Sequence, residues 1–154
     1  MSSQRDARSA QPDAPQSARH SFEEHTGDVK VLVIAPSMEE LFAQAGRSLA
    51  ELMTGQAQPR DGDVGTVEKI TVEAPDRDAL LVEWLNELIF RSEVEKAIFV
   101  DIRVIETSDT RLVANATPLY GQTLKTAVKA ATLHGLHIEE ASDGCCTASV
   151  VLDV

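Results

Sequence analysis

Two aspartates interrupt strongly apolar segments near opposite ends of the chain. Asp28 comes directly before the run from Val29 to Ile34, and Asp153 lies within the run from Val150 to Val154. A lone buried carboxylate is costly, so each needs a partner or water. If the two strands are neighbours, Asp28, Asp153 and the carboxylate of Val154 form an oxygen-only cluster, which is the donor set that Ca²⁺ or Mg²⁺ takes. If they are not neighbours, both aspartates are simply solvated at frayed strand ends, and the residues alone leave both interpretations open.

One lysine and two histidines are further candidates. Lys129 lies in the segment from Thr126 to Thr132, which is interpreted as a strand. It is either an ordinary solvent-facing lysine or a cation placed near an acidic site to contact phosphate or a partner's carboxylate. His25 and His134 could be metal ligands or bases, but structural hydrogen bonding is their more ordinary role, as it is for His137. In an extended segment, the spacing of His134 and His137 does not form a helical metal pair.

The sequence lacks the motifs of several common kinds of binding site and active site. The two cysteines, Cys145 and Cys146, are adjacent, which gives neither a disulfide framework nor a four-ligand zinc site. The sequence contains no glycine-rich phosphate loop, no GxSxG and no HExxH. A small metal-dependent hydrolase remains an alternative, although the two aspartates have no obvious general base in a motif with them.

Composition narrows the class of protein. The chain has 154 residues, with 14 Lys+Arg and 25 Asp+Glu, so its net charge is −11. That charge disfavours stable nucleic-acid binding through clustered basic residues. The longest apolar run is far too short to span a bilayer, so no membrane association is expected. Residues 1–21 are polar, contain no signal-peptide apolar stretch and are predicted to be a disordered tail before a single domain, 22–154. We expect a cytoplasmic protein.

The strands and helices that position these residues are predicted from the pattern of apolar residues and from the prolines, glycines and capping residues that end each element. A strand over 29–34 precedes a helix that begins after Ser37, where Ser37 and Glu40 have the spacing of a capping box. After a loop over 55–65, a strand over 67–73 precedes a second helix, which begins at the N-cap Asp76 and ends near Arg91.

The C-terminal half is dominated by strands. They are expected over residues 98–105, 112–116, 126–132, 136–140 and 147–153. Pro118 should end the second of these, and Asp143-Gly144 should form a type I′ hairpin turn. Crowded hairpins favour an α+β domain with a mostly antiparallel β-sheet and two packed α-helices.

Five motifs, in order, resemble the archease family. They are Glu24-His25-Thr26-Gly27-Asp28; Glu39 to Ala43 with Leu52-Met53-Thr54; Leu80 to Leu88; Val128 to His134; and Val151-Leu152-Asp153-Val154. Each is weak alone, but their order and spacing over Phe22 to Val154 are specific.

The resemblance implies a non-catalytic accessory protein of the tRNA-splicing RNA ligase, which joins RNA ends through a guanylylated histidine. Such a protein promotes guanylylation and multiple turnover of the ligase. By match, Asp28, Asp153 and Val154 would hold a divalent cation, Ca²⁺ or else Mg²⁺ or Mn²⁺. Lys129 would be functionally important, with His25, Thr132 and His134 in the same motifs. A chaperone-like binding module for other RNA-modifying proteins is the alternative, and the sequence leaves the oligomeric state open.

Overall fold

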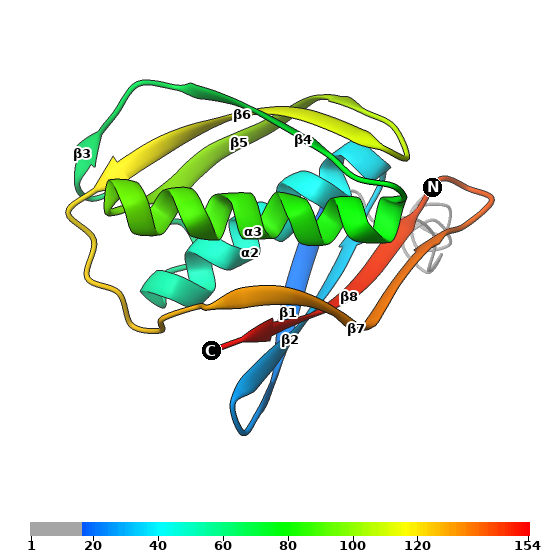
Figure 1. The fold of residues 1–154 in the computed structure, drawn as a ribbon, viewed down its shortest axis with the longest axis horizontal. Helices are drawn as coiled ribbons and strands as arrows, with labels where there is room; N and C mark the ends of the chain where they lie inside the picture. The colour runs from blue at the N-terminus through cyan, green and yellow to red at the C-terminus, as the bar shows by residue number, and fades with distance from the viewer. Residues whose placement is uncertain (1–16) are drawn as a thin grey trace, which may run out of the picture.

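Two antiparallel sheets enclose two helices in the computed structural model, which describes residues 17–154 (Figure 1). Each helix contacts strands of both sheets, so the helices fill the layer between them. This is the predicted α+β domain with mostly antiparallel strands and two packed helices. Neither helix in the described range is long and apolar enough to cross a membrane.

Sheet A contains both candidate aspartates. Its strands run in the order β1-β2-β8-β7, with bounds Arg19–His25 (β1), Asp28–Ala35 (β2), Cys146–Asp153 (β8) and Ala130–Glu140 (β7). Burial alternates along β2 and β8, as expected for a sheet with one face on the core. Asp28 and Asp153 belong to the face that no helix covers.

Sheet B is built around β6. Its strands are β3 (Asp63–Val64), β4 (Glu68–Glu73), β5 (Ala97–Thr107) and β6 (Arg111–Tyr120). β5 pairs with one edge of β6, and β3 and β4 pair with successive parts of the other edge.

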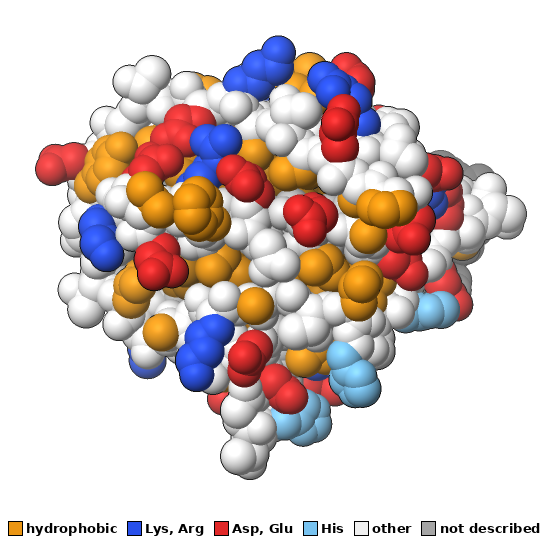
Figure 2. Space-filling model, in the orientation of Figure 1, with side chains coloured by type: hydrophobic (Ala, Val, Ile, Leu, Met, Phe, Trp, Pro, Cys, Tyr) orange, Lys and Arg blue, Asp and Glu red, His pale blue; other side chains and the backbone are white. Residues whose placement is uncertain are grey.

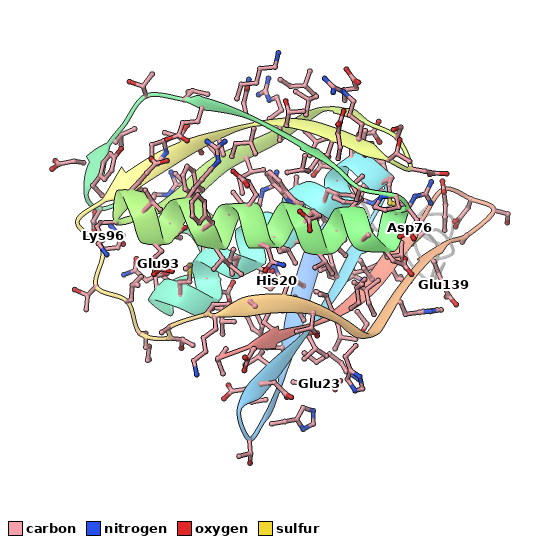
Figure 3. All side chains as sticks on the ribbon, viewed as in Figure 1. His20, Glu23, Asp76, Glu93, Lys96 and Glu139 are labelled. Atoms are coloured by element: carbon pink, nitrogen blue, oxygen red, sulfur yellow. The ribbon has the colours of Figure 1, made fainter. Side chains whose placement is uncertain are left out.

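The helices begin where the sequence predicts. α2 spans Met38–Thr54, and the hydroxyl of its N-cap Ser37 accepts a hydrogen bond from the Glu40 N–H. α3 spans Arg77–Glu95 and is capped in the same way by Asp76, which lies at its N-terminal end in Figure 3. α3 continues beyond the expected end near Arg91 and stops at Lys96, which adopts the left-handed conformation of a C-cap.

The core lies between the sheets and includes both helices. Trp84 of α3 is fully buried, and its Nε1–H donates to the carbonyl oxygen of Phe42 on α2 at 2.8 Å. This bond satisfies the one polar group of the indole and joins the two helices, which fixes the layer against which both sheets pack.

The predicted tail boundary is too late in the chain. β1 begins at Arg19, so residues 19–21 belong to the folded part. His20, expected in the tail, accepts from Gln44 Nε2 at its Nδ1 and donates from its Nε2 to Glu51 Oε1, both at 2.8 Å. These two hydrogen bonds anchor the beginning of β1 to α2, and the hydropathy of the segment alone does not predict this strand. The rest of the expected tail, residues 1–16, lies outside the described residues.

The expected strand break at Pro118 is wrong, because β6 continues through this residue to Tyr120. Pro118 is opposite Phe99 of β5, and its carbonyl oxygen accepts from the Gly65 N–H at 2.8 Å. The proline nitrogen therefore points toward the gap between β3 and β4. No strand residue pairs with β6 there, so the absence of an N–H breaks no ladder hydrogen bond.

Two details of the last hairpin also differ from prediction. The segments 126–132 and 136–140 are not separate strands: β7 runs from Ala130 through Glu140, with its pairing to β8 interrupted between Thr132 and His137. The turn at Asp143-Gly144 is not type I′, because Gly144 has a positive φ of 93° and Asp143 does not. The hairpin loop is longer, and the Gly144 N–H donates to the Ala141 carbonyl.

Candidate functional site

Asp28 and Asp153 are directly opposite each other on neighbouring strands. Asp28 is the first residue of β2 and Asp153 the last of β8, and they are register partners in the antiparallel pair. Directly opposed residues project from the same face, with Cα atoms about 4.5–5.5 Å apart. Asp28 is half-buried and Asp153 is exposed. The two strands are neighbours, which meets the condition set for an oxygen cluster, and the two aspartates project from the same open face of sheet A.

A tight hairpin brings His25 into the same row. His25 and Asp28 are partners that close the two-residue turn Thr26-Gly27 between β1 and β2. Gly27 has φ 82°, which a residue with a Cβ adopts only with strain, although the surrounding space is open. We call His25, Asp28 and Asp153 the acidic row. Figure 2 shows carboxylate and imidazole side chains gathered near this hairpin, and Glu23 lies on it in Figure 3.

The chain around the acidic row is tied together by backbone hydrogen bonds. The Val154 N–H donates to the Gly27 carbonyl at 3.2 Å, which holds the end of β8 against the hairpin turn. The Lys129 N–H donates to the Asp153 carbonyl at 2.8 Å, and Ala130 is the register partner of Asp153. Lys129 therefore lies beside the acidic row, with its side chain exposed.

The strand predicted around Lys129 begins later than expected. Residues 126–129 are not in a strand, and β7 starts at Ala130. The reason is a tertiary contact: the Lys125 and Thr126 N–H groups donate to the Met53 carbonyl at the end of α2. This segment caps a helix before it joins the sheet.

Thr132 and His134 occupy different positions relative to the row. Thr132 is opposite Val151 on the same face as Asp153, and its Oγ1 is buried without a hydrogen-bond partner in residues 17–154. His134 is exposed and lies in the interrupted part of β7, outside the ladder with β8. The strand pairing thus places His25 opposite Asp28, and it places Thr132 opposite Val151, two residues before Asp153. His134 has no partner in the β7–β8 ladder.

The acidic row is free of competing partners in the described range. None of the ion pairs or side-chain hydrogen bonds found in residues 17–154 includes the side chain of Asp28, Asp153 or Lys129. The carboxylates are therefore available to a cation or to a partner. This excludes the ordinary surface ion pair as the reason for their placement.

The donor set suits a hard cation only in part. Carboxylate and main-chain oxygens are ligands for Ca²⁺, Mg²⁺ or Mn²⁺, and the orphaned Thr132 hydroxyl adds an oxygen nearby. The described residues contain no group of three His, Cys, Asp or Glu side chains that could hold a metal ion. Two aspartates would thus need main-chain oxygen and water to complete the coordination sphere, which is compatible with these ions and unlike a structural zinc site.

The groups with shifted pKa values lie elsewhere. Burial tends to lower the pKa of Arg91, but its hydrogen bonds to Glu87 and Glu68, both 2.7 Å, outweigh that effect and raise it. A hydrogen bond with Glu68, together with burial, raises the pKa of Glu95. Burial raises the pKa of the Cys146 thiol. Cys146 is buried at the start of β8, so it is a core residue.

Sequence reasoning missed a contact that Asn86 makes beside the site. Its side-chain amide hydrogen-bonds both the N–H and the carbonyl of Ala131, next to Ala130 at the end of the row. Asn86 belongs to the motif from Leu80 to Leu88 that resembles the family, and its side chain is half-buried on α3. No local sequence pattern predicts that it contacts a strand 45 residues later in the chain.

Fold and site define a small α+β protein with two sheets around two helices and an acidic row on the open face of one sheet. The sequence pattern of the archease protein family matches residues 20–154. The chain belongs to the archease family.

Relatives match over nearly their whole length. The archease of Methanosarcina acetivorans is 29% identical over 149 residues, covering 90% of this chain and 98% of the relative. That of Thermococcus gammatolerans is 33% identical over 143 residues, covering 85% and 95%.

Two solved structures share the fold. A Methanobacterium thermoautotrophicum protein solved in solution matches with a TM-score of 0.65 and 28% identity, covering 88% of this chain and 98% of that one. A Thermotoga maritima protein, described as an archease and possible chaperone, matches with a TM-score of 0.61 over 88% and 98%. At 21% identity, the second supports the fold alone.

Proposed function

We propose that this protein is a non-catalytic accessory protein of the tRNA-splicing RNA ligase and that it promotes the ligase's guanylylation and repeated turnover. The observation that carries the proposal is the direct opposition of Asp28 and Asp153 in a chain of the archease family. These two aspartates occupy the motifs on which the resemblance to the ligase's accessory proteins rests, and no other side chain in residues 17–154 pairs with them.

In this proposal a divalent cation, Ca²⁺ or else Mg²⁺ or Mn²⁺, binds at the acidic row. Asp28 and Asp153 would supply carboxylate oxygens, and Val154 a main-chain oxygen. When bound, the cation would offset the repulsion between the carboxylates and give a positive centre to which a ligase group could bind. His25 and Lys129 would flank it, and the exposed ammonium of Lys129 would contact a carboxylate or phosphate of the ligase complex.

Electrostatics supports a protein partner rather than RNA. The chain's net charge of −11 repels a phosphate backbone, and it attracts a ligase whose RNA- and nucleotide-binding cleft is basic. Long-range attraction of this kind raises the association rate more than the affinity. Stimulation should therefore weaken as salt concentration rises, even where the complex still forms.

The direct test counts ligations. Purified ligase is mixed with excess RNA ends, GTP and Mn²⁺, and the number of ligations per ligase molecule is measured with and without this protein. The wild-type protein should raise it above one, and Asp28→Asn and Asp153→Asn should each abolish most of the stimulation. Asp63→Asn is the matched control, because Asp63 is an exposed strand aspartate that forms none of the ion pairs found in residues 17–154.

Each outcome has a distinct meaning. If Asp28→Asn and Asp153→Asn stimulate the ligase as well as the wild type does, the proposed site is wrong. If the wild type itself leaves the ligase at a single turnover, the proposed function is wrong.

A chaperone-like binding module is the second candidate, and one feature favours it. On the open face of sheet A, a hollow of about 240 Å³ is lined in part by the half-buried apolar side chains of Leu32 and Ile34. Recovery of RNA-modifying enzymes other than the ligase, in a pull-down that also tests Leu32→Ser, would favour this function. Recovery of the ligase by the wild type, lost in Asp28→Asn, would favour the first.

A further inference from the structure

Sheet pairing alone holds the beginning of β7 weakly. Ala130, Ala131 and Thr132 pair with β8, and the next register pair is His137 with Ser149. The first three pairs thus form a short patch separated from the rest of the ladder. β7 is also an edge strand of sheet A, so its outer side has no neighbouring strand. Such an edge exposes backbone groups that can fray or pair with competing strands.

Asn86 occupies that outer edge. Its Nδ2 donates to the Ala131 carbonyl at 3.3 Å, and the Ala131 N–H donates to its Oδ1 at 2.8 Å. A side-chain amide carries the same donor and acceptor as a peptide group, so one residue replaces the missing neighbour strand. α3 runs alongside β7, which lets Asn86 reach the strand from the helix (Figure 1).

The contact bears directly on the acidic row. Ala131 is fixed on one side by Asn86 and on the other by its pairing with Leu152. Two residues earlier, the Lys129 N–H bonds the Asp153 carbonyl at 2.8 Å. Any movement of Ala131 away from β8 would therefore pull on Lys129 and on the main chain of Asp153.

We propose that Asn86 is a positioning residue of the acidic row. Through Ala131 it holds Lys129 and Thr132 at fixed positions relative to Asp153, so that the oxygens and the ammonium group are arranged before a cation or a partner arrives. Arrangement in advance removes an ordering cost from binding. The proposal rests on the proposed cation site for its Tb³⁺ readout and on the proposed ligase function for its activity readout.

The test uses three variants of the full chain. Asn86→Ala removes both hydrogen bonds, whereas Asn86→Asp keeps an acceptor for the Ala131 N–H and loses the donor. Ser48→Ala is the control for simple loss of stability, because it removes a buried hydroxyl that donates to the Ala45 carbonyl within α2. Tb³⁺ luminescence titration serves as the probe of the acidic row, alongside amide hydrogen exchange, the melting temperature and ligase turnover.

Asn86→Ala should speed exchange of the Ala131 amide by about tenfold or more, the effect of losing one or two hydrogen bonds. Loss of a group that hydrogen-bonds a metal ligand commonly weakens ion affinity by about 10–100-fold. Asn86 acts one step further out, through Ala131, so we expect Tb³⁺ affinity to fall by about tenfold, the lower end of that range. Asn86→Asp should lie between Asn86→Ala and the wild type. Ser48→Ala should lower the melting temperature without changing Tb³⁺ affinity.

Equal Tb³⁺ affinity in Asn86→Ala and the wild type would overturn the positioning role, as would equal losses in Asn86→Ala and Ser48→Ala. A wild type that binds no Tb³⁺ would overturn it as well. The proposed function is judged separately: a wild type that binds Tb³⁺ but does not raise ligase turnover would refute the function, and the affinity of Asn86→Ala would still decide the role of Asn86.

Discussion

Replacing Asp28 with Asn should change stability in opposite directions with and without divalent ions. Without such ions, Asp28 and Asp153 are like charges directly across a strand pair, and this arrangement is destabilising. With an ion bound between them, the same two charges become ligands that stabilise the folded state. The substitution Asp28→Asn removes one charge while keeping the size of the side chain, so it reports on charge alone.

The register sets the expected magnitudes. Opposed Cβ atoms are about 5 Å apart, so carboxylate charges about 6 Å apart repel by about 0.7 kcal/mol in water-like surroundings. Removing that repulsion should raise the melting temperature of the variant by about 2 °C in a chain of this length. An ion at about a hundred times its dissociation constant stabilises the wild type by about 2.7 kcal/mol, which should raise its melting temperature by about 5–10 °C.

Thermal unfolding in EDTA and in Ca²⁺ measures both effects. The wild type should melt below Asp28→Asn in EDTA and above it in millimolar Ca²⁺, with Asp63→Asn following the wild type in both. Replacing Ca²⁺ with Mg²⁺ or Mn²⁺ ranks the ions. Parallel responses of wild type and Asp28→Asn to Ca²⁺ would refute the cation site, and a variant less stable in EDTA would refute the repulsion argument.

Three further predictions concern groups away from the site. Because burial raises the pKa of Cys146, its thiol should react with a thiol reagent about tenfold more slowly than that of Cys145, which a Cys145→Ser variant resolves. Hydrogen bonding to Glu68 and burial raise the pKa of Glu95, so the folded state binds this proton more tightly than the unfolded state. The stability it contributes is present below the ordinary glutamate pKa and lost as pH rises through the raised value, so Glu95→Gln should melt at higher temperature relative to wild type as pH increases. Trp84→Phe should lose about 2 kcal/mol in denaturant unfolding, because it removes the indole hydrogen bond to the Phe42 carbonyl and leaves a gap beside it.

Elements with a local cause were predictable from the sequence. Ser37 and Asp76 cap the two helices with their own side chains, so their chemistry is visible within a few residues. Alternating burial in β2 and β8 follows from a side-chain period of two, and it places Asp28 and Asp153 on the open face once the strands are adjacent. The residues alone left open whether the two strands are adjacent, and the family resemblance favoured adjacency.

Other features depend on contacts that no local pattern contains. Pro118 continues a strand because neither β3 nor β4 forms a ladder pair with it at that point, a property of sheet B rather than of proline. His20 joins the domain through Glu51 of α2, 31 residues later in the chain. Lys129 lies outside a strand because the preceding segment caps α2, and Asn86 substitutes for a strand from a helix. In each case tertiary contacts override what the local sequence predicts.

The order of strands in sheet A constrains when the protein can fold. β8 follows all the other described elements along the chain, yet it lies between β2 and β7 and pairs with both. During synthesis, the β1–β2 hairpin and β7 can leave the ribosome, but they have no common neighbour until β8 emerges. Folding of this sheet must therefore wait until translation has passed Asp153, and a nascent chain stalled before that point would expose two unjoined strand edges to chaperones or to aggregation.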